Sequence, residues 1–534
     1  MKAPTPAKYL LAFLLLLAGS VASVRAQTIT SPEIDSVVLR AMQAFQVPGM
    51  AVAVVKDGKV AHMKGYGIRS LNSGKKVDEN TLFGVASNSK AFTAASIGLL
   101  VEEGKLAWDD KVIKYIPEFR LYNDYVTGEF TIRDLLTHRS GLGLGAGDLM
   151  IFPDGNNFTT KDLLQNMQHL RSVSAFRTRY DYDNLLYIIA GEVVARVTGT
   201  SWADFTEKRI LQPLGMTRSA ANFSRLADTT NIIDAHALVE GKLQVIDRYD
   251  LPFADAAGGI YTSVNDLSKW LLMLLNDGKY GDKNQQQLLS ENTIQEQWTP
   301  QTIIPVRGTS PFNTHFSAYG LGWVLSDSKG YKEVNHTGGV PGMVTQVTML
   351  PELNLGIIVL TNQQSGEAFR SVTNTIKQAY LGMDAKDWVD HFVEREKQYK
   401  AEAKTITDKI WQEIDAKLKD KKTKVALDDY TGTFEDKWFG EIEIYRKKNK
   451  LWFRSKRSPK LSGEMLFYKD NTFVVKWTDR SLDADAFVLY SPDGEGITMK
   501  AVSPLTDFSY DFHDLDFKKV QERQSATQPA IRNK

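Results

Sequence analysis

The sequence predicts an α/β (α+β) fold: an antiparallel sheet flanked by helices, with an inserted helical subdomain, followed by a separate small all-β domain. Strand-like patterns lie near both ends of the segment that finishes at about Tyr380, and the middle of that segment is rich in helices and loops. The simplest arrangement joins the end strands into one sheet that the helices cover. After Leu427, short strand-like runs alternate with turn residues, which indicates an independent β domain.

The first residues, 1–26, have the pattern of a secretory signal peptide. Early lysines precede an apolar run from Tyr9 to Ala18, and Val24 and Ala26 are the small residues expected before a cleavage site. We therefore expect a bacterial periplasmic or secreted protein that begins at Gln27 and keeps no stable membrane anchor. An uncleaved anchor is the alternative, although the apolar run is short for crossing a bilayer.

A helix and a hairpin are expected next. Ser31-Pro32-Glu33 supplies a capping serine, a proline at the first helical position and an acidic residue, and the apolar pattern continues to Phe45. The runs Met50–Val55 and Val60–Tyr66 resemble strands, and Asp57-Gly58 between them is a strong hairpin signal.

The rest of this segment combines helices with a second group of strands. Helical patterns run from Ser87 to Glu103, ending before Gly104, and from Leu185 to Thr198, ending before Gly199. Three further strands and a closing helix are expected at Gly322–Ser326, Met343–Leu350, Gly356–Leu360 and Thr361–Tyr380.

The remaining chain divides into a helical linker, a β domain and a tail. Residues 27–382 form the predicted larger domain, residues 383–425 are charged with a helical period, residues 426–521 form the predicted small β domain, and residues 522–534 form a predicted disordered tail. Five strands are expected in the β domain, at Glu441–Tyr445, Lys450–Arg454, Thr472–Trp477, Ala486–Tyr490 and Ile497–Val502.

Composition excludes several classes of function. The formal net charge is +1, so no charge imbalance points to nucleic acid or to a membrane surface as a partner. The absence of cysteine excludes disulfides, thiolate metal sites and a cysteine nucleophile. No group of His, Asp and Glu has the spacing of metal ligands, and we therefore expect neither a metal nor a cofactor.

A serine followed three residues later by a lysine is a candidate catalytic pair, and the chain contains three such pairs. Ser73 and its lysine lie in a polar loop, and Ser326 and its lysine lie beside a turn. Only Ser87, with Lys90, opens a predicted helix after an apolar lead-in. Residues three apart on a helix share a face, so Lys90 can reach the Ser87 hydroxyl.

The start of a helix favours nucleophilic chemistry at Ser87. The amides of the first turn have no partner within the helix, and the helix dipole favours negative charge at this end. Burial can hold Lys90 partly neutral, so that it accepts the serine proton. A capping serine beside an exposed lysine is the alternative that this pair alone leaves open.

Two further motifs follow, Tyr182-Asp183-Asn184 before a predicted helix and His336-Thr337-Gly338-Gly339 much later. With Ser87-Asn88-Ser89-Lys90 they stand in the order Ser-x-x-Lys, Tyr-x-Asn and His-x-Gly. This order resembles the class C β-lactamase and penicillin-binding DD-peptidase family of serine hydrolases, over roughly residues 34–380. Supporting segments are Asp134–Leu142, Ala257–Thr262 and Tyr319–Trp323.

The resemblance implies a role for each motif. Ser87 attacks a carbonyl carbon and carries the acyl group, while Lys90 and Tyr182 act as a coupled pair in proton transfer. Asn184 holds the substrate amide or orients Lys90. The amides of Ser87 and Gly339 form the implied oxyanion hole. The residues implied to line the groove at the sheet edge are His336, Thr337 and Gly338.

His336 departs from the pattern of efficient β-lactamases, which usually carry lysine at this place. Histidine is mostly neutral near neutral pH and offers a substrate carboxylate no fixed charge. The departure favours relatives that act on peptides with D-residues, on amides or on esters. With a pKa near its usual value of about 6.5, His336 should recognise carboxylate substrates better at about pH 6. His138 is expected to be structural.

The sequence therefore predicts an exported serine hydrolase that forms an acyl-enzyme on Ser87 and acts on a small molecule or short peptide as a peptidase, amidase or esterase. The alternatives are a β-lactamase, or a penicillin-binding protein that deacylates slowly and senses a cell-wall ligand. No motif lies beyond Gly339, so a chain that ends near Tyr380 is expected to keep the acylation chemistry. The oligomeric state and the role of the β domain stay open. The aromatic residues Trp438, Phe439 and Trp452 fit a small core better than a binding surface.

Overall fold

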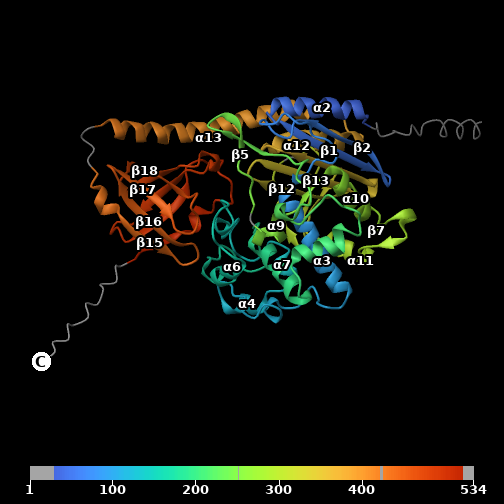
Figure 1. Cartoon of the computed structure of the whole chain (residues 1–534), viewed down its shortest axis with the longest axis horizontal. Coiled ribbons are helices and arrows are strands. Elements are labelled where there is room, and N and C mark those ends of the chain that lie inside the picture. Colours follow the sequence, from blue (N-terminus) through green and yellow to red (C-terminus); the bar gives the residue numbers. More distant parts are fainter. Residues whose placement is uncertain (1–28, 251, 309, 421–424, 521–534) are drawn as a thin grey trace, which may run out of the picture.

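A computed structural model describes residues 29–250, 252–308, 310–420 and 425–520 of the chain (Figure 1). The predicted signal peptide and tail, residues 1–26 and 522–534, lie outside the described residues. The described part contains a helix-covered antiparallel sheet and a closed β barrel, joined by the long helix α13 (Trp388–Lys419). The predicted fold class is confirmed.

One sheet of eight antiparallel strands organises the larger part of the molecule. It is built from both ends of that part, as predicted, because the N-terminal strand β1 lies between β2 and the late strand β14. In spatial order the strands are β2 (Lys59–Gly67), β1 (Gly49–Lys56), β14 (Leu355–Thr361), β13 (Met343–Leu350), β12 (Tyr331–Val340), β11 (Val324–Ser328), β10 (Ser317–Tyr319) and β9 (Thr302–Ile303).

Helices cover both faces of this sheet, which explains why β1 is buried on each side. Val52 packs against α2 (Ser31–Ala44) and α12 (Gly366–Tyr380), whereas its neighbour Ala53 belongs to the core on the opposite face. Successive side chains of a strand point to opposite faces, so one strand serves two cores. Figure 1 shows α2 and α12 above the sheet and the other helices of this part below it.

The helices below the sheet include the inserted subdomain. Their bounds are α3 (Ser89–Glu102), α4 (Asp124–Glu129), α5 (Ile132–Leu135), α6 (Thr160–Asn166), α7 (Leu185–Thr198), α8 (Trp202–Thr206), α9 (Asp255–Gly258), α10 (Val264–Leu275) and α11 (Glu291–Gln297). Helix α7 has the range that its sequence predicted. Among the described residues, no helix is both long and apolar enough to cross a bilayer.

Two local predictions need correction. The N-cap of α2 is Thr30 and not Ser31, which is the first helical residue, and the Thr30 amide and hydroxyl both donate to the Glu33 carboxylate, at 2.7 and 2.8 Å. The sequence pattern also did not predict β12 as a strand. Its stretch 335–339 is polar and rich in glycine, and such residues favour strands poorly unless neighbouring strands hold them.

The C-terminal domain closes into an eight-stranded barrel. Strand β15 pairs with both β16 and β22, so the first and last strands complete the ring. The sequence predicted five of these strands and missed β15, β18 and β22. Trp438 and Phe439 are buried in the core, as expected, whereas Trp452 is only half-buried and packs under Lys447. The strands are β15 (Gly432–Asp436), β16 (Gly440–Lys447), β17 (Lys450–Ser455), β18 (Ser462–Lys469), β19 (Thr472–Trp477), β20 (Ala486–Tyr490), β21 (Gly496–Ala501) and β22 (Asp516–Lys519).

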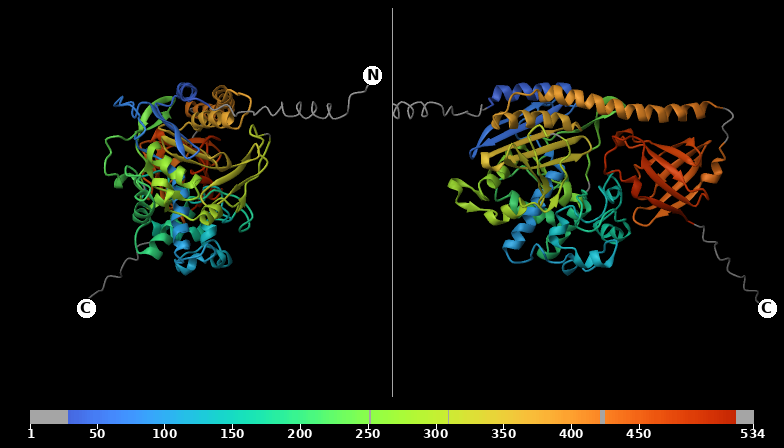
Figure 2. Two further views of the ribbon diagram at one scale, coloured as in Figure 1. Left: turned by 90° about the vertical axis from the view of Figure 1, so that its right-hand side faces the viewer. Right: turned by 180° about the vertical axis from the view of Figure 1, so that it is seen from behind.

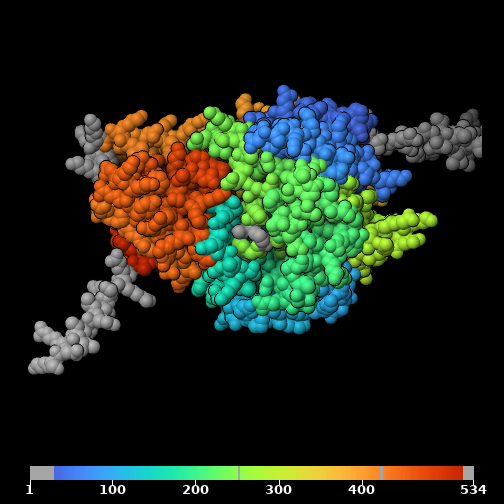
Figure 3. Space-filling view, viewed as in Figure 1, coloured from blue at the N-terminus to red at the C-terminus, as the bar shows by residue number. Residues whose placement is uncertain are grey.

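The barrel packs directly against the helical subdomain. Phe439 of the barrel and Phe158 have ring centroids 6.0 Å apart, and the Arg457 guanidinium lies 3.0 Å from the Asp162 carboxylate. Figure 2 shows α13 running from the sheet across to the barrel, and Figure 3 shows the barrel and the subdomain in contact on the face in view. Further pairs that join the two parts are Asn166–Trp438, Arg171–Asp516 and Lys460–Asp154.

Candidate active site

A pocket of about 530 Å³ opens where the sheet, the helical subdomain and the barrel meet. Its wall includes Ser87, Tyr182, Asn184 and the β12 stretch 336–339, together with residues 507–509 of the barrel. The structure therefore brings the residues of all three sequence motifs to one place. The serines of the other two Ser-x-x-Lys pairs do not line this pocket.

Ser87 lies in a tight turn between strand β3 (Phe83–Gly84) and helix α3. Residues 86–88 form one 3₁₀ turn and α3 begins at Ser89, so Ser87 precedes the α-helix, whereas the sequence predicted that it opens the helix. Ala86 has a φ of 46°, a left-handed conformation that is costly for a residue with a side chain. The strained residue, Ala86, directly precedes Ser87, so its conformation helps to set the direction of the Ser87 side chain.

Lys90 reaches Ser87 from inside the protein. Its side chain is fully buried, and its nitrogen Nζ lies 3.0 Å from Ser87 Oγ, 2.7 Å from Asn184 Oδ1 and 2.9 Å from the Ala257 carbonyl oxygen. Burial lowers the pKa of Lys90 to about 7, although the charges of Asp148 and Asp183 act in the opposite direction. Lys90 is therefore available as a neutral amine near neutral pH.

The neutral amine fits its surroundings. It has two hydrogens and one lone pair, and two pure acceptors, Asn184 Oδ1 and the Ala257 carbonyl, take the hydrogens. The lone pair is then left for the hydroxyl hydrogen of Ser87, at a nitrogen–oxygen distance of 3.0 Å. This geometry allows Lys90 to remove the serine proton.

Tyr182 lies on the other side of the same lysine, whose nitrogen is 4.9 Å from the centre of the tyrosine ring. Burial raises the pKa of Tyr182 well above its usual value, and a hydrogen bond with Ser87 opposes this shift only in part. The phenol therefore keeps its proton at neutral pH. The Tyr182 phenol is therefore suited to relay a proton, and not to act as a permanently deprotonated base.

His138 supports this arrangement from behind, as a structural residue. Its ring centroid lies 4.2 Å from that of Tyr182, and its Nδ1 accepts the amide of Asp183 at 3.1 Å. Burial lowers the pKa of His138 well below its usual value, so the ring stays neutral and Nδ1 stays an acceptor. His138 thus holds the Tyr182-Asp183-Asn184 segment in place without touching Ser87.

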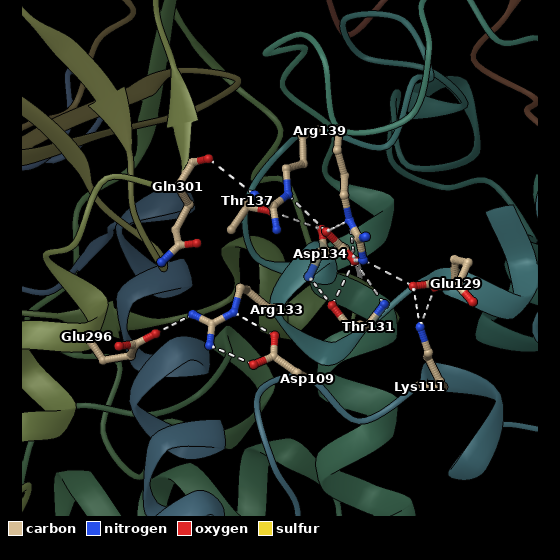
Figure 4. Close-up of polar contacts among 11 residues, drawn as sticks. Asp109, Lys111, Glu129, Thr131, Arg133, Asp134, Thr137, Arg139, Glu296 and Gln301 are labelled. Atoms are coloured by element: carbon tan, nitrogen blue, oxygen red, sulfur yellow. Dashed lines mark hydrogen bonds and ion pairs between the residues drawn. The ribbon is translucent and has the colours of Figure 1, made fainter.

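The loop that carries His138 is anchored by a buried carboxylate, Asp134 (Figure 4). Arg139 and Arg177 donate to it at 2.9 and 2.5 Å, and the Thr131 hydroxyl donates at 2.7 Å. Burial alone would raise the pKa of Asp134, but these donors hold it below its usual value. The Asp134 carboxylate therefore stays charged, and its contacts with both arginines hold the loop in place.

Strand β12 forms the next wall of the pocket. Beyond Asn335 it pairs with β13 only, so the stretch 336–340 presents the free strand edge that the resemblance implied. Gly338 must be a glycine, because a Cβ atom there would lie 2.1 Å from the carbonyl oxygen of Val85. This close approach brings Gly339 and Thr337 to the Ser87 turn.

His336 is less accessible than the sequence led us to expect. The side chain is buried, its Nδ1 lies 2.6 Å from the Thr337 carbonyl oxygen, and its Nε2 lies 2.9 Å from the Tyr319 hydroxyl. Burial and the nearby charge of Lys90 lower the pKa of His336 to about 3. The expectation that His336 gains a charge at about pH 6 and then binds a carboxylate is therefore wrong.

The barrel completes the pocket, which the sequence did not predict. Phe508 meets Tyr182 edge to face, with ring centroids 5.9 Å apart, and Asp507 and Ser509 also line the pocket. The sequence contains no motif beyond Gly339, yet residues 507–509 of the barrel form part of the pocket wall. No local pattern marks this loop, because it acquires its role only when the barrel docks.

The arrangement contains what an acyl-transfer site needs: a nucleophile, a buried amine, a protonated phenol and backbone amides at a strand edge. Within the described residues, no group of three or more His, Cys, Asp or Glu side chains is placed to hold a metal ion. The Beta-lactamase family model matches residues 34–381, which is most of the chain. The chain belongs to the Beta-lactamase family. A second family model, a domain of unknown function (DUF3471), matches residues 416–519, which include the barrel.

Curated relatives of this Beta-lactamase family member include a fungal and a bacterial protein. It is 29% identical over 377 residues to Unguisins hydrolase ungD of Aspergillus violaceofuscus (strain CBS 115571), an alignment that covers 66% of this chain and 65% of that protein. It is 26% identical over 339 residues to Protein flp of Staphylococcus aureus (strain COL), covering 62% and 63%. The chain thus spans slightly less than two thirds of each of these relatives.

Two solved structures share the fold over nearly the whole chain. The octameric penicillin-binding protein homologue from Pyrococcus abyssi aligns with a TM-score of 0.59 at 22% identity, covering 92% of this chain and 100% of that one. The crystal structure of SurE aligns with a TM-score of 0.53 at 18% identity, covering 92% and 99%. At these identities the likeness concerns the fold alone.

Proposed function

We propose that the protein is an exported serine hydrolase that works through an acyl-enzyme on Ser87 and acts on small peptides, amides or esters. The observation that carries this proposal is the 3.0 Å contact between the Lys90 nitrogen and the Ser87 hydroxyl oxygen, in a pocket of about 530 Å³. A pocket of this size suits a small ligand or a short peptide.

Acylation transfers one proton from Ser87 to Lys90 and then, through Tyr182, to the leaving group. The neutral Lys90 amine takes the hydroxyl proton of Ser87 as the oxygen attacks the substrate carbonyl carbon, and the carbonyl electrons move onto its oxygen. The amides of Ser87 and Gly339 are the proposed donors to that oxyanion. Lys90 returns the proton through Tyr182 to the departing amine or alcohol, and the bond between carbon and leaving group breaks.

Deacylation runs the same path in reverse. A water molecule attacks the acyl carbon and gives its proton to the Lys90–Tyr182 pair, and the ester bond to Ser87 breaks as Ser87 regains a proton. Both half-reactions need the amine to be neutral when each attack begins. The rate of the second step decides between a hydrolase and a protein that stays acylated.

The substrate class is supported by two observations. His336 is buried and neutral, so it supplies no positive charge for the carboxylate of a penicillin or cephalosporin. One relative carries the name Unguisins hydrolase, which favours hydrolysis over ligand sensing. Peptides, amides and esters are therefore the proposed substrates, with efficient β-lactam turnover as the less favoured alternative.

Covalent labelling with a fluorophosphonate tests whether Ser87 is the nucleophile. The fluorophosphonate should label wild-type protein at Ser87, and Ser87→Ala should abolish labelling. Ser73→Ala and Ser326→Ala remove the serines of the other two Ser-x-x-Lys pairs and serve as matched controls that should label normally. Mass spectrometry of the labelled peptide gives the position, and a label on Ser73 or Ser326 would overturn the assignment.

Ester turnover then separates the hydrolase from the slowly deacylating alternative. With a chromogenic ester, a hydrolase releases many equivalents of product for each protein molecule. A ligand sensor releases a burst of one equivalent and remains acylated, which the intact mass of the protein reports.

Export is proposed from the N-terminal pattern alone. Production in a Gram-negative host with fractionation should place the protein in the periplasm, with a mature N-terminus at Gln27. An N-terminal peptide that retains residues 1–26 would contradict this part of the proposal.

A further inference from the structure

One buried aspartate of the barrel is connected to Lys90 through a short chain of contacts. Burial, and the neighbouring Asp148, raise the pKa of its carboxyl group well above the usual value. Asp511 lies in the segment after β21 and is fully buried. Its two oxygens accept the amide of Gly147 at 2.7 Å and the amide of Leu149 at 2.9 Å. These two donors flank Asp148 in the chain, so the barrel holds the backbone on both sides of that residue.

Asp148 continues the path to the active site. Asn184 donates from Nδ2 to Asp148 Oδ2 at 2.8 Å, and the other end of the same amide group, Oδ1, accepts from Lys90 at 2.7 Å. The amide of Asn184 can satisfy both partners only in one orientation, because its two ends are a donor and an acceptor. The position of Asp148 therefore determines which end of Asn184 faces Lys90.

A second contact from the same barrel segment fixes the other end of this loop. Phe508 rests on Gly145, where a Cβ atom would lie 2.7 Å from the Phe508 carbonyl oxygen and where φ is 71°. The Gly145 amide donates to the Tyr182 carbonyl at 2.8 Å. The barrel thus supports residues 145–149 at two places, one beside Tyr182 and one beside Asp148.

We propose that Asp511 is a positioning residue of the active site, which holds Asp148 against Asn184 and so keeps Lys90 directed at Ser87. The barrel is then a component of the catalytic apparatus and not an appended domain. This role presupposes the serine hydrolase proposed above and adds to it a requirement for the C-terminal domain.

The charge of Asp148 makes this role measurable. The ionised form of Asp148 raises the pKa of Lys90, against the larger effect of burial. Burial and the neighbouring Asp183 raise the pKa of Asp148 itself well above its usual value, and the charge of Lys90 opposes this shift. If Asp148 moves away from Asn184, Lys90 loses part of this stabilisation of its charged form, and its pKa falls. The rate of acylation, which needs the neutral amine, then reaches half its plateau at a lower pH. The groups that face Lys90 are Asp148, Asp183, Tyr182, Tyr187, His138 and His336.

Asp511→Asn tests the proposal in the full-length protein. Asparagine keeps the volume but has one acceptor oxygen, so one of the two backbone amides loses its partner. We expect the rate constant of fluorophosphonate labelling at Ser87 to fall by about tenfold or more, the scale of misplaced catalytic groups. We also expect the pH midpoint of that rate to move down. Asp511→Ser, which likewise accepts fewer amides, is made in parallel so that the result does not depend on one variant.

The matched control is Asp516→Asn, which breaks another contact between the barrel and the subdomain, the 2.6 Å pair with Arg171. It should keep the wild-type rate constant and midpoint. The final extent of labelling counts folded molecules, while the rate constant and midpoint report on the site, so a loss of folded protein is recognised separately.

A double variant decides whether Asp511 acts through Asp148. Asp148→Asn should lower the midpoint by itself, and adding Asp511→Asn should move it no further. A folded Asp511→Asn protein with the wild-type rate and midpoint would overturn the proposal, as would an equal loss in Asp516→Asn or a further shift in the double variant. Failure of wild-type protein to label at Ser87 would instead overturn the proposed function.

Discussion

Lys90 lies 3.0 Å from the hydroxyl oxygen of Ser87, and its two remaining close contacts are acceptors, Asn184 Oδ1 at 2.7 Å and the Ala257 carbonyl at 2.9 Å. A charged ammonium would have to donate to Ser87, whereas a neutral amine accepts from it. Because burial lowers the pKa of Lys90 to about 7, the productive form is well populated near neutral pH.

Acylation of Ser87 should therefore accelerate as the pH rises through about 7, the lowered pKa of Lys90. The sign follows from the base: raising the pH converts the ammonium into the neutral amine that takes the serine proton. The check is the second-order rate constant of fluorophosphonate labelling across this range. Lys90→Arg keeps a permanent charge, so its rate should be low and flat, and a wild-type rate that falls with pH would contradict the assignment.

Lys90→Ala and Tyr182→Phe should each lower kcat/KM for an ester by about a hundredfold or more, the usual scale for losing acid–base catalysis. Since the two side chains share one proton path, the double variant should lose little more than either single one. Tyr187→Phe is the control, because Tyr187 also faces Lys90, at 5.3 Å, but bonds to the Leu136 carbonyl. Full additivity would show two independent roles.

His336 should not sense the charge of the substrate. Its pKa is lowered to about 3, so it stays neutral throughout the working range. We expect the ratio of kcat/KM for two matched esters, with and without a terminal carboxylate, to stay constant between about pH 6 and about pH 8. The Lys90 titration cancels in this ratio. A preference for the carboxylate ester that grows toward low pH would show that His336 is charged and exposed.

The buried ion pair between Lys377 and Glu333, 2.8 Å apart, should be sensitive to removal of one partner. Lys377→Met leaves the Glu333 carboxylate buried without its cation and should lower the free energy of unfolding by about 3–5 kcal/mol. Urea unfolding measures this. Adding Glu333→Gln should recover much of the loss, and Arg40→Ala, which breaks an exposed pair, should cost about 0–1 kcal/mol. Equal losses of unfolding free energy in Lys377→Met and Arg40→Ala would contradict the distinction between buried and exposed ion pairs.

Elements with a strong local pattern were predictable. The hairpin around Asp57-Gly58 formed as expected because both residues take the left-handed conformation that such a turn requires, and α7 has its predicted range because its apolar period and its final Gly199 agree. The local strand pattern did not predict β12, although the family resemblance implied a sheet edge at residues 336–338. Its stretch 335–339 is held by pairing with β13, and at Asn335 also with β11, and not by its own propensity.

The candidate site divides in the same way. Ser87, Lys90, Tyr182 and Asn184 were recognisable because their types and order follow a family pattern, and the structure brings them within contact. Asp148 and Asp511 carry no such pattern. A buried aspartate in a loop is indistinguishable from an exposed one until the segments around it have packed.

The sequence by itself determined the fold class, the family and the chemical types of the site, since periodicity, turn residues and motif order are local properties of the chain. The tertiary structure alone decided the protonation states and the role of the barrel. The pKa values of Lys90 and His336 depend on how completely other segments exclude water. The contact of Asp511 with Gly147 and Leu149 joins residues more than 360 positions apart, which no local pattern can encode.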